Sequence, residues 1–289
     1  MFLSHPAFSR EIHAYHQAAL PQRENGCAAF ALTCLLRGLG WQAWEGREIT
    51  PDLAAYLAGM VALENGYPFD ADPGTAMQHR WGFPRAYDYA LRRSADLAAV
   101  GTGPEGLVRA TETLTGSALA ALPVRGRAAD GTPLTAADLW AVVDCLLVPD
   151  HAPWAAQVVF NYQAGHLAAL EGPGQGWGTL LFGEESLPCT WDVGHMTSLA
   201  GVVAGRRGER ALVIRDNSPH FGWHGYHAEQ AAAAARALAR TDGSQGGMLV
   251  LCRTTDRDEV QASLAEVLPH GDFSLWDNGS AYVPPPPLS

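Results

Sequence analysis

The sequence of 289 residues contains no lysine, and all 19 of its basic side chains are arginine. Without a lysine amine, the chain excludes enzymes that form Schiff bases, attachment of pyridoxal phosphate, and the lysine-dependent phosphate sites of P-loop proteins and kinases. The serine nucleophile elbow G-x-S-x-G and the zinc-binding helix H-E-x-x-H are also missing. These absences remove several large enzyme classes.

Long apolar runs, excess positive charge and paired cysteine motifs are absent as well. No apolar run approaches the roughly 18 residues of a membrane-spanning helix, and the N-terminus lacks the features of a signal peptide. The 30 acidic residues outnumber the 19 basic ones, giving a net charge of −11 that repels phosphate backbones. Five cysteines without a C-x-x-C pair indicate neither a disulfide framework nor a zinc ribbon. We therefore expect a cytoplasmic protein that binds neither nucleic acid nor membrane.

The hydrophobic content of 47% is enough for a sizeable core, and the two halves of the chain differ in pattern. The first half predicts helices over residues 26–40, 51–65, 87–100, 107–114 and 135–147. The second half predicts short strands over residues 157–162, 178–182, 195–204, 210–215 and 247–253, and helices over 229–240 and 256–268. The pattern predicts an α+β fold with a largely antiparallel sheet.

We expect one domain over residues 1–282, with a helical half over about 1–150 and a sheet half over about 151–282. The proline-rich tail, 283–289, is predicted to be extended and poorly ordered. Residues 101–106 match the dinucleotide-binding pattern G-x-G-x-x-G. A helix is predicted before them and no acidic residue follows about 20 positions later at a strand end, so we do not expect a nucleotide site there.

The strongest chemical signal is Cys27, which opens a predicted helix directly after Asn25 and Gly26. The positive end of a helix dipole and its free N–H groups stabilise a thiolate. The same N–H groups can hold a developing oxyanion, with the Gln22 amide as a second donor. Cys34, seven residues further along the apolar helix, fits a plain core position instead.

A histidine and an acid downstream can complete this site. His195 begins one predicted strand, and Asp216 follows the next strand after a tight turn, so the two are expected to be neighbours. An acid there would orient the imidazole for a cysteine nucleophile. His166 is the rival histidine, but no acid stands at a comparable place after it. Asn217 is the rival orienting residue, since strand alternation puts only one of residues 216 and 217 on the site's face.

These segments together resemble the C39-like branch of the papain-like cysteine peptidases. The resemblance rests on Gln22-x4-Cys27, on GTGPEGLVRATETLTG, and on the Gly-His strand, turn and strand ending in Asp216. It covers residues 20–40, 100–116 and 155–220. The sequence departs from the family at Ala28, where glycine is usual, in the longer stretch 41–100, and in having no transporter domain after it.

The resemblance implies a helical part carrying the nucleophile, packed on an antiparallel sheet carrying the histidine and the acid. It assigns Cys27 as nucleophile, His195 as general base, Asp216 as orienting acid and Gln22 as oxyanion donor. The expected chemistry is acyl transfer through a Cys27 thioester, as in a peptidase, an amidase, or a peptide acyltransferase or cyclase. The substrate would be a peptide or a small acyl or amide compound, and no cofactor is implied.

Two other functions remain open from the sequence. His220, His224 and His227 stand close enough together to ligate zinc or another first-row metal, with Asp216 or Glu229 as an oxygen ligand. Alternatively, this histidine- and aromatic-rich segment lines a substrate groove, with Trp223, His224 and Asn217 as binding residues. A catalytically inactive, peptidase-like binding protein is the second of these functions, and it predicts a Cys27 no more reactive than the other cysteines.

Overall fold

The structure is a computed structural model that describes residues 2–3, 10–64, 86–147, 156–167, 192–205, 208–218 and 225–288. Its main sheet has the strand order β10-β9-β8-β7-β11-β6, with β1 paired to β8, and every pairing is antiparallel. The bounds of these strands are β1 Phe2–Leu3, β6 Leu119–Arg125, β7 Gln157–Gln163, β8 Gly194–Ala204, β9 Arg210–Arg215, β10 Tyr226–Glu229 and β11 Gly247–Arg253. The predicted α+β class and antiparallel sheet are confirmed.

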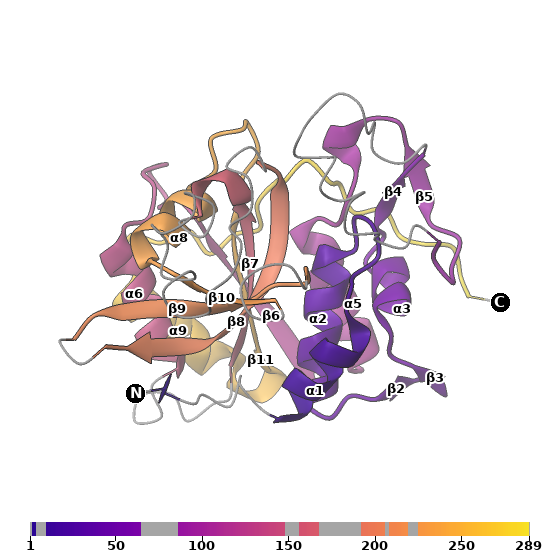
Figure 1. Cartoon of the computed structure of the whole chain (residues 1–289), viewed down its shortest axis with the longest axis horizontal. Coiled ribbons are helices and arrows are strands. Elements are labelled where there is room, and N and C mark those ends of the chain that lie inside the picture. Colours follow the sequence, from indigo (N-terminus) through magenta and orange to yellow (C-terminus); the bar gives the residue numbers. More distant parts are fainter. Residues whose placement is uncertain are drawn as a thin grey trace.

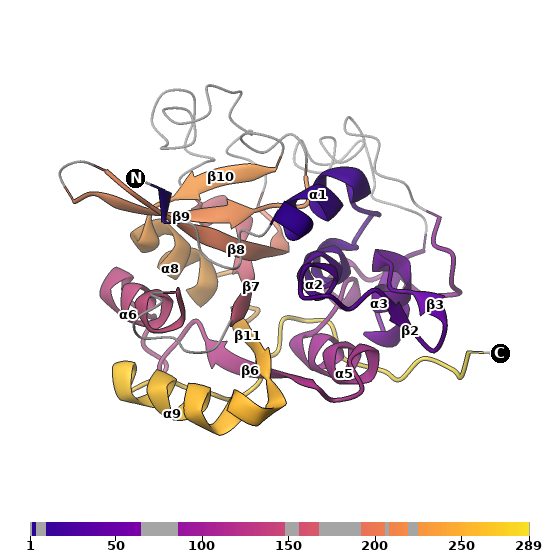
Figure 2. The same ribbon diagram turned by 90° about the horizontal axis from the view of Figure 1, so that it is seen from below.

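Helices lie on both sides of this sheet, as Figures 1 and 2 show. One group is α1 (Arg10–Ala19), α2 (Cys27–Gly38), α3 (Pro51–Leu57) and α5 (Pro104–Leu114). The other group is α6 (Ala136–Leu147), α8 (Ala231–Ala239) and α9 (Arg257–Val267). Within the described part of the chain, no helix has the length and apolar character needed to cross a membrane.

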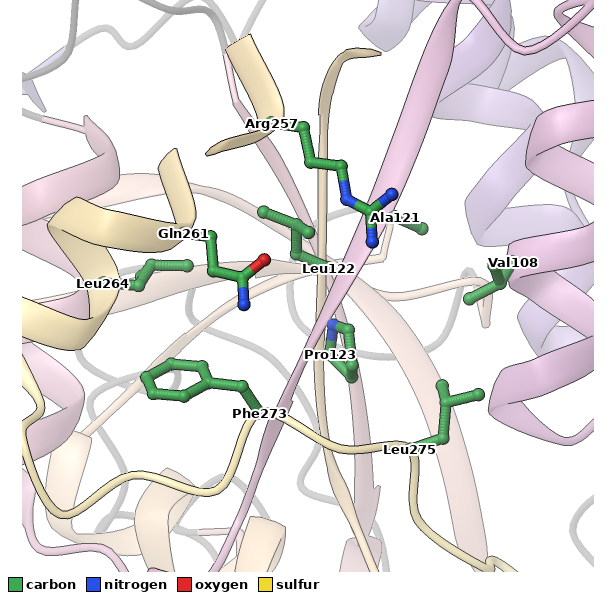
Figure 3. A pocket seen from close by; sticks show the side chains of 9 residues that line it. All are labelled: Val108, Ala121, Leu122, Pro123, Arg257, Gln261, Leu264, Phe273 and Leu275. Carbon is green, nitrogen blue, oxygen red and sulfur yellow. The ribbon is translucent and has the colours of Figure 1, made fainter. Parts of the chain in front are cut away.

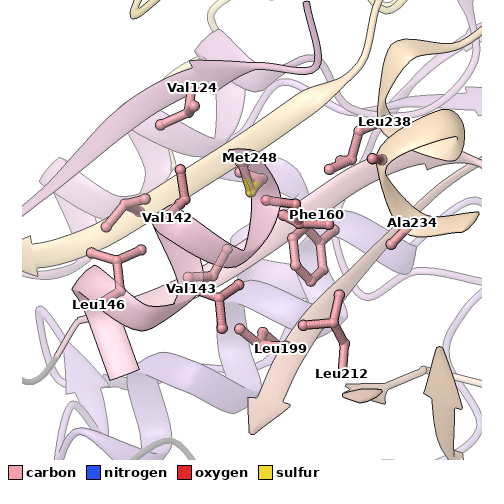
Figure 4. Packing of buried hydrophobic residues seen from close by; sticks show 14 of the residues in the cluster. Val124, Val142, Val143, Leu146, Phe160, Leu199, Leu212, Ala234, Leu238 and Met248 are labelled. Atoms are coloured by element: carbon pink, nitrogen blue, oxygen red, sulfur yellow. The ribbon is translucent and has the colours of Figure 1, made fainter. Parts of the chain in front are cut away.

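Each helix layer closes its own hydrophobic core against one face of the sheet. Alternating residues of β7 and β11 supply both cores, so that Phe160 and Met248 pack on the α6 side, and Val159 and Leu249 on the α2 side. Figure 4 shows the first of these cores. All seven residues of β7 are buried, as expected for a strand covered on both faces. The sheet is therefore a rigid central layer.

Local signals explain where several helices begin. Pro51 occupies the first turn of α3, and the Thr50 side chain accepts a hydrogen bond from the Leu53 N–H at 3.2 Å. Before α6, the Thr135 hydroxyl accepts the Asp138 N–H at 3.2 Å, and the Asp138 carboxylate accepts the Thr135 N–H at 2.8 Å. This reciprocal arrangement is a capping box, so each helix starts at a residue its sequence specifies.

Some predicted elements are wrong or differ in length. Residues 87–100 do not form an α-helix: they contain strand β5 (Arg92–Ser94), paired with β4 (Val61–Leu63), and a 3₁₀ turn over Leu97–Ala99. The helix predicted over 51–65 ends at Leu57, before β4. The predicted strand 178–182 lies outside the described residues. The remaining small sheet pairs β2 (Ala43–Trp44) with β3 (Arg47–Glu48).

Strand β6 lies inside the segment assigned to the helical half, and it pairs with the late strand β11. Short-range patterns cannot reveal such a pairing between residues more than a hundred positions apart. Helix α1 was also not predicted, because only Ile12 and His16 of its ten residues are buried and its apolar stripe is short.

The glycines of the G-x-G-x-x-G pattern serve packing. A Cβ on Gly103 would lie 2.1 Å from the Ser280 carbonyl oxygen, and one on Gly106 would lie 2.1 Å from that of Ala58. Gly101 has φ of +110°, a conformation that favours glycine. The pattern therefore marks close backbone contacts with a neighbouring helix and with the C-terminal segment.

That C-terminal segment passes along α3. The Tyr56 hydroxyl donates a hydrogen bond to the Pro286 carbonyl, and Leu288 packs against the core on the α2 side. The tail is predicted to be extended and poorly ordered. As far as residue 288 it makes these contacts along α3, and its degree of order stays a prediction.

Candidate active site

Cys27 is the first residue of α2 and is partly exposed. Asn25, with φ of +63°, turns the chain into the helix. Gly26 follows it, at a position where a Cβ atom would lie only 2.9 Å from the Tyr87 hydroxyl oxygen, closer than a Cβ atom normally approaches another heavy atom. The first hydrogen bond of the helix joins the Phe30 N–H to the Gly26 carbonyl at 2.9 Å. The backbone N–H groups of Cys27 and the next two residues therefore lack intrahelical acceptors and carry the positive end of the helix dipole.

The other cysteines of the described chain are buried. Burial raises the pKa of Cys34 to about 12, and burial together with Asp256 raises that of Cys252 to about 11. Burial also raises the pKa of Cys145. Cys189 lies outside the described residues. Cys27 is thus the accessible thiol among the four that can be compared.

The structure brings His195 and Asp216 together. His195, near the start of β8, directs Nε2 at the Asp216 carboxylate, with distances of 3.0 Å to Oδ2 and 3.2 Å to Oδ1. Both side chains are buried. The Cys27 side chain lies close enough to His195 to raise the pKa of its imidazole. Since Nε2 is occupied by Asp216, Nδ1 is the ring nitrogen left for the thiol.

The ionisation of this pair follows from its contacts. Burial lowers the pKa of His195. The charge of Asp216, its hydrogen bond to the ring and the nearby Cys27 together outweigh burial and raise this pKa to about 10. Burial raises the pKa of Asp216, but His195 and His227 outweigh it and hold it well below its usual range. An ionised carboxylate and a cationic imidazole are therefore the favoured states.

Asp216 is held from several directions. Its Oδ1 accepts the Ser218 N–H at 2.9 Å, and the Tyr162 hydroxyl lies 3.3 Å from Oδ2. The backbone carbonyl of Asp216 accepts a hydrogen bond from His16 Nε2 at 2.6 Å. Burial and the charge of Arg215 lower the pKa of His16 to about 3, so His16 acts here as a neutral donor. The carboxylate has one defined position.

Asn217 takes a structural place beside the site. Its side-chain amide donates to the Cys27 carbonyl at 2.9 Å and to the Met196 carbonyl at 2.8 Å. It thereby ties the first turn of α2 to β8. The hydrogen bonds of the Asn217 amide go to these two carbonyls, whereas the His195 ring is bonded to the Asp216 carboxylate. Of the two rival residues, Asp216 is therefore the one in place to orient His195.

Gln22 lies behind the Cys27 turn and is 7% exposed. Its backbone N–H donates to the Asn217 carbonyl at 3.4 Å. Its side-chain oxygen, Oε1, is buried and accepts no hydrogen bond from the residues that the structure describes. A buried acceptor without a donor is costly, so this oxygen is suited to an N–H or O–H group that these residues do not supply.

The remaining candidate residues fall elsewhere or outside the described chain. His166 lies in a 3₁₀ turn after β7 (Ala164–His166) and its Nε2 is 3.0 Å from the Thr241 hydroxyl, away from Cys27. His220, Trp223 and His224 lie outside the described residues. Among the residues that the structure does describe, no group of three His, Cys, Asp or Glu side chains is arranged to hold a metal.

His227, which the sequence left open as a metal ligand, lies in the buried cluster of ionisable side chains around Asp216. Its Nδ1 is 3.1 Å from Glu229 Oε1, and its Nε2 is 3.8 Å from Asp216 Oδ2. Glu229, at 0% exposure, is the acid beside it. The sequence singled out Glu229 only as a possible metal ligand, although its i, i+2 spacing from His227 on one short strand places both side chains on one face.

A separate pocket of about 310 Å³ lies at the β6 edge of the sheet (Figure 3). Apolar side chains of β6 and of the segment after α9, such as Leu122 and Phe273, form its walls, with Arg257 and Gln261 of α9 at its polar side. None of its lining residues belongs to the Cys27 site. The pocket and the cluster are thus distinct features.

The fold and the cluster define an α+β protein in which a partly exposed thiol at a helix start meets a buried imidazole–carboxylate pair. The chain belongs to a family of unknown function, DUF6885, whose match extends over residues 6–277. No curated protein matches the chain. The family description names no activity, so a function has to be inferred from the site itself.

Proposed function

We propose that the protein is a cysteine-dependent acyl-transfer enzyme with a papain-like arrangement. The observation that carries the proposal is the connected series of Cys27, His195 and Asp216, with the carboxylate 3.0 Å from the imidazole. Nucleophilic cysteine catalysis needs a thiol, a base in contact with it and a third group that orients the base. The packing of α2 against β8, which holds Cys27 beside the sheet, supports the papain-like arrangement.

The proposed chemistry begins with the Cys27 thiol proton already on His195, the cationic state that the contact with Asp216 favours. The thiolate attacks an ester or amide carbonyl, forming the S–C bond of a tetrahedral intermediate. Its oxyanion accepts hydrogen bonds from the Cys27 N–H and from the Gln22 side-chain amide. His195 then returns the proton to the leaving oxygen or nitrogen as the bond to the acyl group breaks, leaving a thioester on Cys27.

The second half of the reaction consumes this thioester. Water as acceptor gives a peptidase or amidase, and an amine gives an acyltransferase or cyclase. In both cases His195 takes a proton from the acceptor as it attacks, and the Cys27 thiolate leaves. Asp216 remains ionised throughout and stabilises the imidazolium. The substrate class is a peptide or a small acyl or amide compound.

The test is to trap the thioester with an activated acyl ester and to locate the acyl group by peptide mass spectrometry. We expect one acyl group on Cys27, released by hydroxylamine, in the wild type. Cys27→Ala should lose it, and His195→Gln should slow its formation by about 10²-fold or more, the usual contribution of a general base. The matched variant His166→Gln should behave like the wild type.

Acylation spread evenly over the accessible thiols, or unaffected by His195→Gln, would contradict the proposal. That result would favour the hypothesis that the protein is a non-catalytic binding protein with a peptidase-like fold.

A further inference from the structure

The site contains more buried charge than a cysteine, a histidine and an acid require. Behind Asp216 lies a second histidine–carboxylate pair, His227 and Glu229, whose side chains are 1% and 0% exposed. Their contact, 3.1 Å from Nδ1 to Oε1, is a hydrogen-bond distance. Burying two ionisable groups is costly unless each compensates the other or a third group. Hydrophobic packing alone therefore does not explain why His227 and Glu229 are buried.

The geometry connects the pair to the proposed active site. His227 Nε2 lies 3.8 Å from Asp216 Oδ2, an ion-pair contact longer than a hydrogen bond. The same Oδ2 is the oxygen 3.0 Å from His195 Nε2. Asp216 Oδ2 thus faces two imidazoles. One is His195, beside Cys27, and the other is His227, which contacts Glu229.

Strand pairing fixes this arrangement. On β10, His227 lies opposite Ile214 of β9 and Glu229 lies opposite Leu212, so both side chains are on one face of the strand. Asp216 directly follows β9, and its backbone N–H donates to the Gly225 carbonyl at 2.6 Å, just before β10. The β9–β10 hairpin therefore sets the distance between Asp216 and His227.

The ionisable groups around His227 come from several elements. Asp216 and Glu229 face it directly, and His195 of β8 and Tyr162 of β7 lie across Asp216. Arg215 lies next to Asp216 in sequence, and the neutral His16 of α1 contacts the Asp216 backbone. Burial lowers the pKa of His227, but the contacts with Asp216 and Glu229 outweigh it and raise it to about 9. A cationic His227 thus stands between two carboxylates.

We propose that His227 and Glu229 are positioning residues that hold the Asp216 carboxylate against His195 and share its charge. They touch neither thiol nor substrate and act through Asp216. This inference rests on the proposed function, since it concerns how the Cys27–His195 pair is tuned. Glu229 keeps His227 cationic, and His227 fixes one side of Oδ2.

The direct test uses the pH dependence of Cys27 alkylation by iodoacetamide, read by peptide mapping. Replacing His227 by glutamine removes a buried positive charge. Loss of this charge should raise the pKa values of both Cys27 and His195. We expect His227→Gln to move the midpoint of the Cys27 profile upward by about one pH unit, the effect of a nearby buried charge. The double variant His227→Gln/Glu229→Gln should move it by no more than the single variant.

Two controls separate positioning from mere support of the fold. His166→Gln removes a histidine paired with Thr241 and should leave the midpoint unchanged. In the wild type with EDTA present, side-chain ¹⁵N NMR should show the His227 imidazolium persisting to about pH 9, and Glu229→Gln should lower its titration midpoint. This second measurement needs no His227 variant and stands even where such a variant fails to fold.

An unchanged Cys27 midpoint in a folded His227→Gln variant, or a His227 that titrates at its ordinary value of about 6.5, would overturn the inference. A Cys27 that reacts no faster than the other thiols would instead overturn the proposed function. The NMR titration would then still report whether the His227–Glu229 pair exists, so the two failures are distinguishable.

Discussion

The two ends of the sheet bury different kinds of side chain. Around β11 and β6 the buried groups are apolar, such as Met248, Val250 and Val124. In the part of the sheet formed by β8, β9 and β10, the buried groups include His195, Asp216 and the pair His227 and Glu229, all at most 4% exposed. Apolar burial stabilises a fold at every pH, whereas a buried ionic cluster stabilises it only while its members stay ionised. The first region maintains the scaffold, and the second is suited to chemistry.

The largest expected effect comes from the apolar region. Phe160→Ala on β7 removes a fully buried ring between the sheet and α8, and such a truncation costs about 3–5 kcal/mol. Urea unfolding at pH 6 measures this loss. The rate of Cys27 alkylation in the remaining folded protein should match the wild type. A selective loss of Cys27 reactivity would mean that the two regions are not separate.

Gln22→Ala should affect only the chemical region. Removing one oxyanion donor lowers the rate of acyl transfer by about 10²-fold or more. Alkylation of Cys27 by iodoacetamide forms no oxyanion and should be little changed, so the two rates measured together isolate the oxyanion role. Gln42→Ala, whose amide donates to Arg37 in an exposed segment, is the matched control and should change neither rate. Equal loss of both rates in Gln22→Ala would contradict the assignment.

The pH dependence of stability should distinguish the two regions further. The pKa of Asp216 is depressed, so its contribution is present above its unfolded value of about 3.9 and is lost as the pH falls further. The raised pKa values of His195 and His227, about 10 and about 9, give contributions that are complete below about pH 6.5 and lost as the pH rises through those values.

Stability should therefore be greatest between about pH 4 and pH 6.5 and fall toward pH 10 by at least about 1.4 kcal/mol, the equivalent of one pKa unit. Urea unfolding across this range measures the slope. The slope between pH 6.5 and pH 10 should be shallower in His227→Gln, and it should be unchanged in the core variant Phe160→Ala. Equal slopes in all three proteins would show that the cluster is not ionised as described.

The smallest effect is expected at a helix cap. Thr135→Ala removes the hydroxyl that starts α6 and should cost about 1 kcal/mol, without altering Cys27 reactivity. Thermal or urea unfolding measures it, and Thr254→Ala provides an exposed threonine as comparison. A loss of several kcal/mol would mean that α6 depends on this cap more than on its packing against the sheet.

The sequence predicts the local part of this architecture well. The β8–turn–β9 pattern and the Cys27 helix are short-range features, and the juxtaposition of His195 with Asp216 follows from how neighbouring strands pair. The choice of Asp216 over Asn217 could not be made beforehand, since it depends on the exact residue at which β9 ends.

The long-range part could not be predicted. Pairing of β6 with β11 joins segments more than a hundred residues apart, and no short-range hydrophobic pattern in the sequence predicts this pairing. The contacts of His227 could not be predicted for the same reason. In sequence it stands near two other histidines, but the β9–β10 hairpin turns it toward Asp216 and Glu229.

The most direct test of the central claim is the alkylation rate of every cysteine in the wild type, in His195→Ala and in His166→Ala. We expect that Cys27 reacts fastest in the native protein, that His195→Ala slows Cys27 selectively, and that His166→Ala does not. Under denaturant all five cysteines should react alike in each protein, which confirms that the differences come from the fold. Equal native rates at all thiols, or a Cys27 rate that responds to His166 and not to His195, would contradict the account.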